Sequence, residues 1–293
     1  MTATTNGIRI IHNMNRISRN LAAFITHAMK GHAKTTYREL SVERCNIFDL
    51  MANYMGFTVL HPGGLKATKR LAESCRIDQR MRVLDIACGK GNASVYLAKQ
   101  YGCSVVGIDT SEDFIAQAAT RARRNELEGV VGFHVADALD MPFSDDEFDV
   151  AITQSLLVWV SDEKRAIQEA LRVTKRGGYV GWLELTWKKQ PTAELLETAS
   201  SLISPYHQLK ARTVEGWESL FMFAGVKQLE IITPSMKFKD IGETIADEGL
   251  VNTAKVLFRY LTNHAVRKRI NAMEKFLDES AEYLGFGIYI GNK

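Results

Sequence analysis

The hydrophobic positions of this chain fall into two patterns. Short apolar runs recur along it, and segments with apolar residues three or four positions apart separate them. The short runs are typical of buried strands, and the wider spacing is typical of amphipathic helices. The strands expected are residues 83–86, 104–109, 130–135, 148–155, 179–185, 228–232 and 286–291. This alternation predicts an α/β fold with a mostly parallel sheet.

Residues 1–64, ahead of the first strand and its preceding helix, are expected to form a helical segment. Ile10, Met14 and Leu21 recur at helical spacing, no acidic residue precedes Glu39, and residues 42–54 are expected to form another helix. A basic amphipathic start is typical of an organelle presequence and also suits a membrane surface. The simpler alternative is a helix docked on the domain with its basic side toward water.

Composition narrows the class of protein. The chain has 293 residues, enough for one enlarged domain or two small ones, and 46% of them are hydrophobic. A net charge of +3 is too small to indicate nucleic acid as a partner. The four cysteines show no metal-binding spacing, so no metal site is expected and a reducing, cytoplasmic compartment is favoured. No apolar stretch approaches the roughly 20 residues of a membrane span.

The sequence VLDIACGKG at residues 83–91 joins a predicted strand to a helix that begins near Asn92. Gly89 and Gly91 carry no Cβ and therefore let a ligand approach the backbone closely. The turn also aims the free N–H groups of the next helix at that ligand. Asp85 at the strand end would repel a pyrophosphate and attract an ammonium group. This loop therefore predicts a site for a ligand with a cationic end.

Further candidate contacts follow at the ends of the next strands. Asp109 ends the second strand about 20 residues after the glycine loop, where a carboxylate accepts hydrogen bonds from ribose hydroxyls. Asp137 closes the third strand and Gln154 ends the fourth. Strand ends of an open parallel sheet converge on one crevice. The candidate cofactor-binding residues are Asp85, Ala87, Gly89, Gly91, Asp109, Thr110, Asp137, Ala138 and Gln154.

Each of these residues also has a simpler structural interpretation. A glycine pair after a strand is often only a tight turn, Asp109 could cap the following helix, and Asp137 could form a turn. The combination favours binding, because an acid, two glycines and two further acids follow one another on successive strand-to-helix loops.

With these motifs the chain resembles the class I SAM-dependent methyltransferases, in particular the small-molecule group that acts on quinone precursors, sterols and small amines. The resemblance implies a Rossmann-like three-layer sandwich whose seven-stranded, mostly parallel sheet has an antiparallel last strand. It implies S-adenosylmethionine (SAM) as cofactor and S-adenosylhomocysteine (SAH) as product. It also implies a methyltransferase domain at residues 65–293, with helical substrate-cap insertions at about 190–210 and 240–284 and a lid at residues 1–64.

The main rival to this family is a nicotinamide-dependent oxidoreductase. Its glycine loop needs a third small residue, glycine or alanine, three positions after the second glycine. That position holds Ser94, and Asp85 is badly placed for a diphosphate. A second alternative is a SAM-binding pseudoenzyme or assembly factor that lacks chemistry.

The resemblance implies methyl transfer to a small molecule by in-line displacement. A lipid-like or aromatic carbon or oxygen acceptor is expected first and a small amine second. The Asn- or Asp-Pro-Pro-aromatic motif of nucleobase methylation is missing, which disfavours nucleic acid. No catalytic base can be named, since Gln154 and Ser155 are not basic. His61 could face the pocket, although a histidine before Pro-Gly-Gly is often only a turn residue. A homo-oligomer and a membrane-surface contact through the amino-terminal helix remain open.

Overall fold

The computed structural model describes residues 42–205, 209–234, 236 and 240–293. Its centre is one sheet in the order β3-β2-β1-β4-β5-β8-β7, with β6 beside β5. The strands are β1 (Arg82–Ile86), β2 (Ser104–Asp109), β3 (Val131–Val135), β4 (Phe148–Gln154), β5 (Thr174–Trp187), β6 (Arg212–Thr213), β7 (Lys227–Ile232) and β8 (Leu284–Asn292).

Strand directions confirm the predicted fold class. Strands β1 to β5 pair in parallel, and β8 runs antiparallel between β5 and β7. The prediction of seven strands was one short, because the sheet has eight. The additional strand β6 pairs in parallel with the end of β5. It spans two residues, which is too short to leave a hydrophobic pattern in the sequence.

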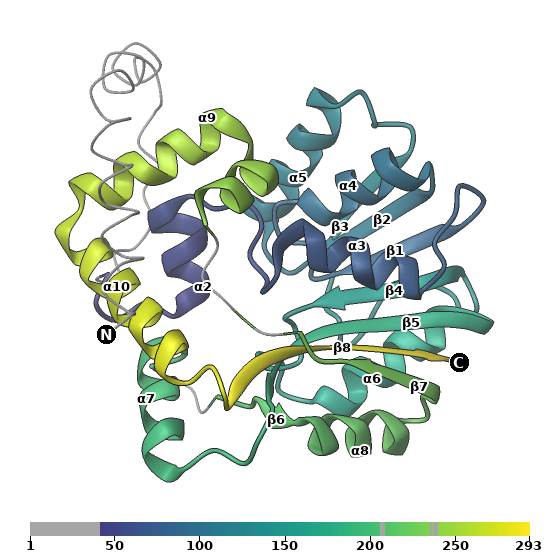
Figure 1. The fold of residues 1–293 in the computed structure, drawn as a ribbon. Helices are drawn as coiled ribbons and strands as arrows, with labels where there is room; N and C mark the ends of the chain where they lie inside the picture. Colours follow the sequence, from purple (N-terminus) through teal and green to yellow (C-terminus); the bar gives the residue numbers. More distant parts are fainter. Residues whose placement is uncertain (1–41, 206–208, 235, 237–239) are drawn as a thin grey trace.

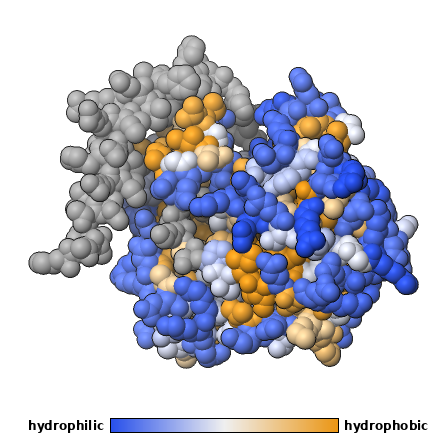
Figure 2. All heavy atoms as spheres, turned by 45° about the vertical axis from the view of Figure 1, so that its right-hand side comes forward, coloured by the Kyte–Doolittle hydropathy of each residue, from blue (hydrophilic) through white to orange (hydrophobic). Residues whose placement is uncertain are grey.

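Helices cover both faces of the sheet (Figure 1). On one face α3 (Gly64–Ser74), α4 (Asn92–Tyr101) and α5 (Glu112–Arg124) pack on inward side chains such as Val83. On the other, α6 (Glu163–Val173) and α8 (Val214–Ala224) cover Leu84 and its neighbours. Successive strand residues therefore serve opposite cores, as the two-residue period of a strand requires. Polar residues cover most of the surface shown in Figure 2 outside its grey atoms.

A helical cap stands beside the sheet (Figure 1). It contains α2 (Ile47–Asp49), the π-helix η1 (Leu50–Met55), α7 (Ala193–Ile203), α9 (Ile241–Thr262) and α10 (His264–Glu279). The insertions expected at about 190–210 and 240–284 contain α7, α9 and α10. A separate apolar cluster that includes Leu50, Phe57 and Val266 joins η1 to α9 and α10. The cap therefore has a core of its own.

The sequence predicts two helices in the amino-terminal segment, and only the second lies among the described residues. Residues 42–54, expected as one α-helix, contain α2 and most of η1, since a wider π turn cannot be told from an α turn over so few residues. The basic helix expected around residues 10–28 lies outside the described residues. Within the described part of the chain, no helix combines the length and apolarity that crossing a membrane requires.

Candidate active site

In the turn between β1 and α4, every second residue has a left-handed backbone conformation: Ala87, Gly89 and Gly91. A Cβ on Gly89 would meet only Leu60 Cδ1, at 3.9 Å, so this position faces open space. A Cβ on Gly91 would lie 2.7 Å from Ala118 Cβ, so this position faces α5. Gly89 thus opens the backbone to a ligand, whereas Gly91 allows close packing of α4 on α5.

Asp85 is buried at the end of β1, with 1% of its surface exposed. Its carboxylate accepts a 2.6 Å hydrogen bond from Ser94 Oγ. Burial raises the pKa of Asp85 from 3.8 to about 7, and the nearby charge of Asp109 acts in the same direction. A bound cation would favour the ionised carboxylate. Ser94 therefore has a polar role at the position where a dinucleotide-binding loop requires glycine or alanine.

Asp109 at the end of β2 is tied to the glycine loop. Its carboxylate accepts hydrogen bonds from Gly89 N at 3.0 Å and from Ser111 N at 2.9 Å. Burial raises the pKa of Asp109 by more than these hydrogen bonds lower it. The N-cap of α5 is Ser111, which accepts a hydrogen bond from Phe114 N. Asp109 therefore does not have the N-cap role that the simpler interpretation gave it.

A narrow cavity of about 30 Å³ lies against this loop, and we call it the cofactor cavity. Four predicted site residues line it: Asp85, Ala87, Gly89 and Gln154. The remaining predicted residues are not in its wall: Gly91, Asp109, Thr110, Asp137 and Ala138. Asp109 adjoins the cavity through its bond to Gly89 N.

The outlying predicted residues lie on neighbouring strand-to-helix loops. Thr110 and Asp137 are exposed, and Ala138 is buried. The Asp137 carboxylate accepts a hydrogen bond from Leu139 N at 2.9 Å, which forms a local turn. Asp137 therefore forms the turn that the simpler interpretation expected.

The opposite wall of the cofactor cavity comes from residues 58–61, which belong to the expected lid but are not among the predicted cofactor-binding residues. Lys90, between the two glycines, donates hydrogen bonds to Ala52 O at 2.7 Å and Phe57 O at 3.1 Å. Burial lowers the pKa of this lysine to about 8. Its bonds fix the end of η1 against the glycine loop. A lysine flanked by glycines gave no sequence signal for such a long-range contact.

Helix α9 holds the same segment from the other side. Glu248 Oε1 accepts hydrogen bonds from Thr58 N at 2.8 Å and Val59 N at 2.9 Å. Its other oxygen accepts from Thr58 Oγ1 at 2.7 Å, and Asn92 Nδ2 donates to the same hydroxyl. The cap insertion is thereby connected to the start of α4. These partners are 190 residues apart in the chain, too far for a motif to reveal.

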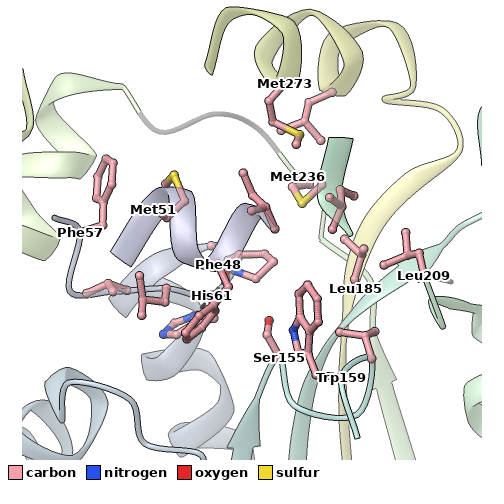
Figure 3. A pocket seen from close by; sticks show the side chains of 18 of the residues that line it. Phe48, Met51, Phe57, His61, Ser155, Trp159, Leu185, Leu209, Met236 and Met273 are labelled. Atoms are coloured by element: carbon pink, nitrogen blue, oxygen red, sulfur yellow. Dashed lines mark hydrogen bonds between the residues drawn. The ribbon is translucent and has the colours of Figure 1, made fainter. Parts of the chain in front are cut away.

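A second, larger cavity adjoins the first, and we call it the acceptor cavity. Its volume is about 210 Å³, and its walls come from η1, residues 57–63, the end of β4 and the cap helices (Figure 3). Phe48, Val59, Leu60 and His61 line both cavities. Among the described residues, the wall contains no Asp, Glu, Lys or Arg side chain. The acceptor cavity is thus a mainly apolar space next to the glycine loop.

His61 lies where the two cavities meet (Figure 3). Its Nδ1 is 3.2 Å from Pro62 O, and its Nε2 is 3.3 Å from Thr68 Oγ1. The Thr68 hydroxyl in turn donates to Gln154 Oε1 at 2.8 Å. A polar chain therefore connects His61 to the end of β4. The sequence analysis left two roles open for His61, a pocket residue or a turn residue, and the structure places it in the wall of both cavities.

Comparisons with known proteins agree with this geometry. Residues 84–181 match the family described as "Methyltransferase domain". This match and the similar proteins named as methyltransferases support a SAM-dependent methyltransferase. An uncharacterized protein of Haemophilus influenzae is 29% identical to the methyltransferase over 79% of this chain and 92% of that protein. Methyltransferase GfsG of Streptomyces halstedii is 26% identical over 67% of this chain and 74% of that protein.

A solved structure of similar fold has another named activity. The [4+2]-cyclase SpnF superposes with a TM-score of 0.62 and 24% sequence identity, over 83% of the methyltransferase and 92% of that chain. At this identity the likeness shows the shared fold alone.

The residues of the loop fit SAM, the cofactor of this family. At Gly89 the backbone is open to a ligand, and any larger side chain would fill that space. Asp85 has a buried carboxyl group that suits a cationic group. Asp109, bonded to Gly89 N, lies at the edge of the cofactor cavity and suits the ribose hydroxyls. When bound, SAM supplies an electrophilic methyl group. Among the described residues no group of three or more His, Cys, Asp or Glu is placed to hold a metal ion.

Proposed function

We propose that this methyltransferase transfers the methyl group of SAM to an apolar, uncharged small-molecule acceptor. The observation that carries the proposal is the acceptor cavity, which adjoins the cofactor cavity and shares four wall residues with it. Burying apolar surface there contributes about 25 cal/mol per Å² removed from water, so a hydrophobic compound gains most from this space. A lipid-like or aromatic acceptor fits these walls.

A charged acceptor is disfavoured by the same walls. A phosphorylated or carboxylated compound would need a cationic partner, and an unpaired charge in an apolar site is costly. The described wall offers only aliphatic, aromatic and sulfur-containing side chains besides His61, Ser155, Trp159 and Thr244. A small amine remains the second class of acceptor if the rest of that compound is apolar.

The protein's own contribution to the reaction is alignment. Holding the acceptor atom beside the methyl group can supply several kcal/mol of the barrier. The end of β4 adjoins both spaces, since Gln154 lines the cofactor cavity and Ser155 lines the acceptor cavity. Trp159 and Leu185 in the wall keep the neighbouring space apolar.

The proposal is tested by incubating the purified protein with methyl-labelled SAM and a panel of acceptors. One arm contains apolar phenols, terpene alcohols and macrolide aglycones, and the other contains phosphoethanolamine, glycine and sarcosine. We expect labelled product and stoichiometric SAH in the apolar arm only. Turnover confined to the charged arm would refute the proposed acceptor class.

A second candidate function is SAM binding without methyl transfer. The structural similarity to a [4+2]-cyclase favours considering it, because that likeness shows that this fold is not limited to proteins named methyltransferases. The same assay separates the two candidates. SAM binding without any SAH formation across both arms would favour the binding protein.

We also propose a cytoplasmic location, as the sequence analysis expected. All four cysteines, Cys45, Cys75, Cys88 and Cys103, are free and buried, which is compatible with a reducing compartment. The division into a lid at residues 1–64 and a catalytic domain at 65–293 is likewise a proposal, supported by the contact of residues 47–61 with both cavities. Fractionation of cells with an antibody to the chain would test the location.

A further inference from the structure

Ser155 follows the last residue of β4 with an unusual backbone. Its φ is +63°, in the left-handed region that residues with a Cβ seldom adopt. A 2.7 Å hydrogen bond from Ser155 N to Leu183 O holds the residue against β5. Backbone strain of this kind lowers stability and often accompanies functional sites.

The hydroxyl of Ser155 points into the acceptor cavity (Figure 3). It forms no hydrogen bond with any described residue. The other polar groups of the wall are mostly engaged: Thr244 Oγ1 donates to Asp240 O at 2.8 Å, and both ring nitrogens of His61 have neighbours. Among the described lining residues, only the indole N–H of Trp159 likewise forms no hydrogen bond.

A glycine would adopt this backbone without the cost that a Cβ imposes. The serine therefore keeps a hydroxyl in an apolar cavity at the expense of stability. In such a cavity, a ligand group that satisfies this hydroxyl gains more than it would in water, since the local dielectric constant is low. The combination of a strained backbone and an unengaged hydroxyl calls for a ligand partner.

We propose that Ser155 Oγ is the hydrogen-bonding anchor for an oxygen atom of the acceptor. The inference rests on the proposed function and narrows it: the acceptor is an apolar compound that carries an oxygen near the methyl group. Ser155 follows Gln154, which lines the cofactor cavity, so the anchor stands where the two cavities adjoin. The serine fixes the acceptor's orientation and takes no proton.

The test compares 1-naphthol with naphthalene, two compounds that differ by one hydroxyl. Calorimetry measures their binding to the SAH-saturated wild type and to Ser155→Ala and Ser155→Gly. We expect the wild type to bind 1-naphthol about tenfold more tightly, as one net hydrogen bond allows. Both variants should lose that preference while still binding naphthalene.

Thermal unfolding supplies the second readout, because the strain argument predicts a gain in stability. Ser155→Gly should raise the unfolding midpoint, and Ser155→Ala should leave it nearly unchanged. The matched control is Glu126→Gly, an exposed residue with φ +58° far along the chain from the cavity walls. This control should also gain stability but keep the preference for 1-naphthol.

Each contrary result has a distinct meaning. Equal binding of both compounds by the wild type would overturn the anchor and leave the proposed apolar acceptor intact. Failure to bind either compound would overturn both. A preference that persists in Ser155→Ala would assign the anchor to another group, and a lower midpoint in Ser155→Gly would refute the strain argument.

Discussion

The cofactor cavity and the acceptor cavity are built in different ways. Asp85 at the end of β1 and Ala87, Gly89 and Lys90 in the turn that follows supply much of the cofactor cavity wall. The acceptor cavity takes its wall from at least five separate segments, between Ile47 and Leu277. The first depends on backbone shape and hydrogen bonds, and the second on packed apolar side chains. A site of the first kind leaves a motif in the sequence, whereas a site of the second kind does not.

The largest effect that separates the two cavities is expected from Gly89→Val. The valine side chain would enter the cofactor cavity, and its φ of +53° adds strain. We expect the affinity for SAH, measured by calorimetry, to fall by more than about 100-fold, since a filled cavity excludes the ligand. Naphthalene binding in the acceptor cavity should persist.

Gly177→Val is the matched control. Gly177 also has a positive φ, of +75°, but a Cβ there would meet nothing within 4 Å. This variant should show the same kind of strain and bind SAH normally. If both variants bound SAH equally well, the loop would be only a turn.

Asp109→Ala is expected to have the next largest effect. The change removes the carboxylate that we expect to bind the ribose, which is also the partner of Gly89 N. Loss of two charge-assisted hydrogen bonds should weaken SAM binding by about 2–4 kcal/mol, measured by calorimetry. An unchanged dissociation constant would remove Asp109 from the cofactor site.

The same contrast explains how much the sequence could predict. The strands follow from short apolar runs, the antiparallel last strand follows from the family resemblance, and Asp85 and Gly89 are both in the cavity wall. The roles of Lys90, Glu248 and Ser155 could not be predicted. Lys90 bonds to carbonyls more than 30 residues away, Glu248 to a segment 190 residues away, and the strain at Ser155 depends on its tertiary setting.

Gly89 and Gly91 show what the motif leaves undetermined. Both stand in one motif and both have a positive φ, yet only the one at position 89 faces open space. The spacing of the motif could not reveal that Gly91 packs against Ala118, because that contact depends on where α5 lies. A motif therefore indicates a site without assigning a role to each of its residues.

The pH dependence of SAM binding tests the role of Asp85 in the cofactor cavity. With a pKa of about 7, Asp85 is protonated in mildly acidic solution and must lose that proton to pair with a cation. We expect the affinity for SAM to fall about tenfold for each pH unit below 7. Calorimetry in buffers of different ionisation enthalpy should detect proton release. Binding that is flat between pH 5 and 7 would contradict this role.

Stability without ligand should move in the opposite direction. The native protein binds this proton more tightly than the unfolded chain, in which the pKa returns to about its ordinary value of 3.8. The contribution of Asp85 to stability is therefore complete below pH 3.8 and is lost as the pH rises to about 7. Asp85→Asn should remove this part of the pH dependence in thermal unfolding.

The smallest predicted effect tests whether the two cavities are independent. Glu248 lies in neither wall, but its carboxylate holds Thr58 and Val59, and Val59 lines both cavities. Glu248→Gln keeps an oxygen for the two backbone N–H groups and replaces the other acceptor with a donor. We expect SAH and naphthalene affinities to fall together by about threefold to tenfold, as a lost charge-assisted bond of 1 kcal/mol or so implies.

Glu243→Gln on the same helix is the control. Glu243 is exposed, and its substitution removes the same charge as Glu248→Gln does. It should change neither affinity, which would separate the contact made by Glu248 from the field of α9. Hydrogen exchange at residues 57–61 should rise in Glu248→Gln alone, because three of the bonds that hold Thr58 and Val59 involve this carboxylate. A loss confined to one ligand would mean that the shared wall transmits nothing, and the two cavities would then be separate sites on one scaffold.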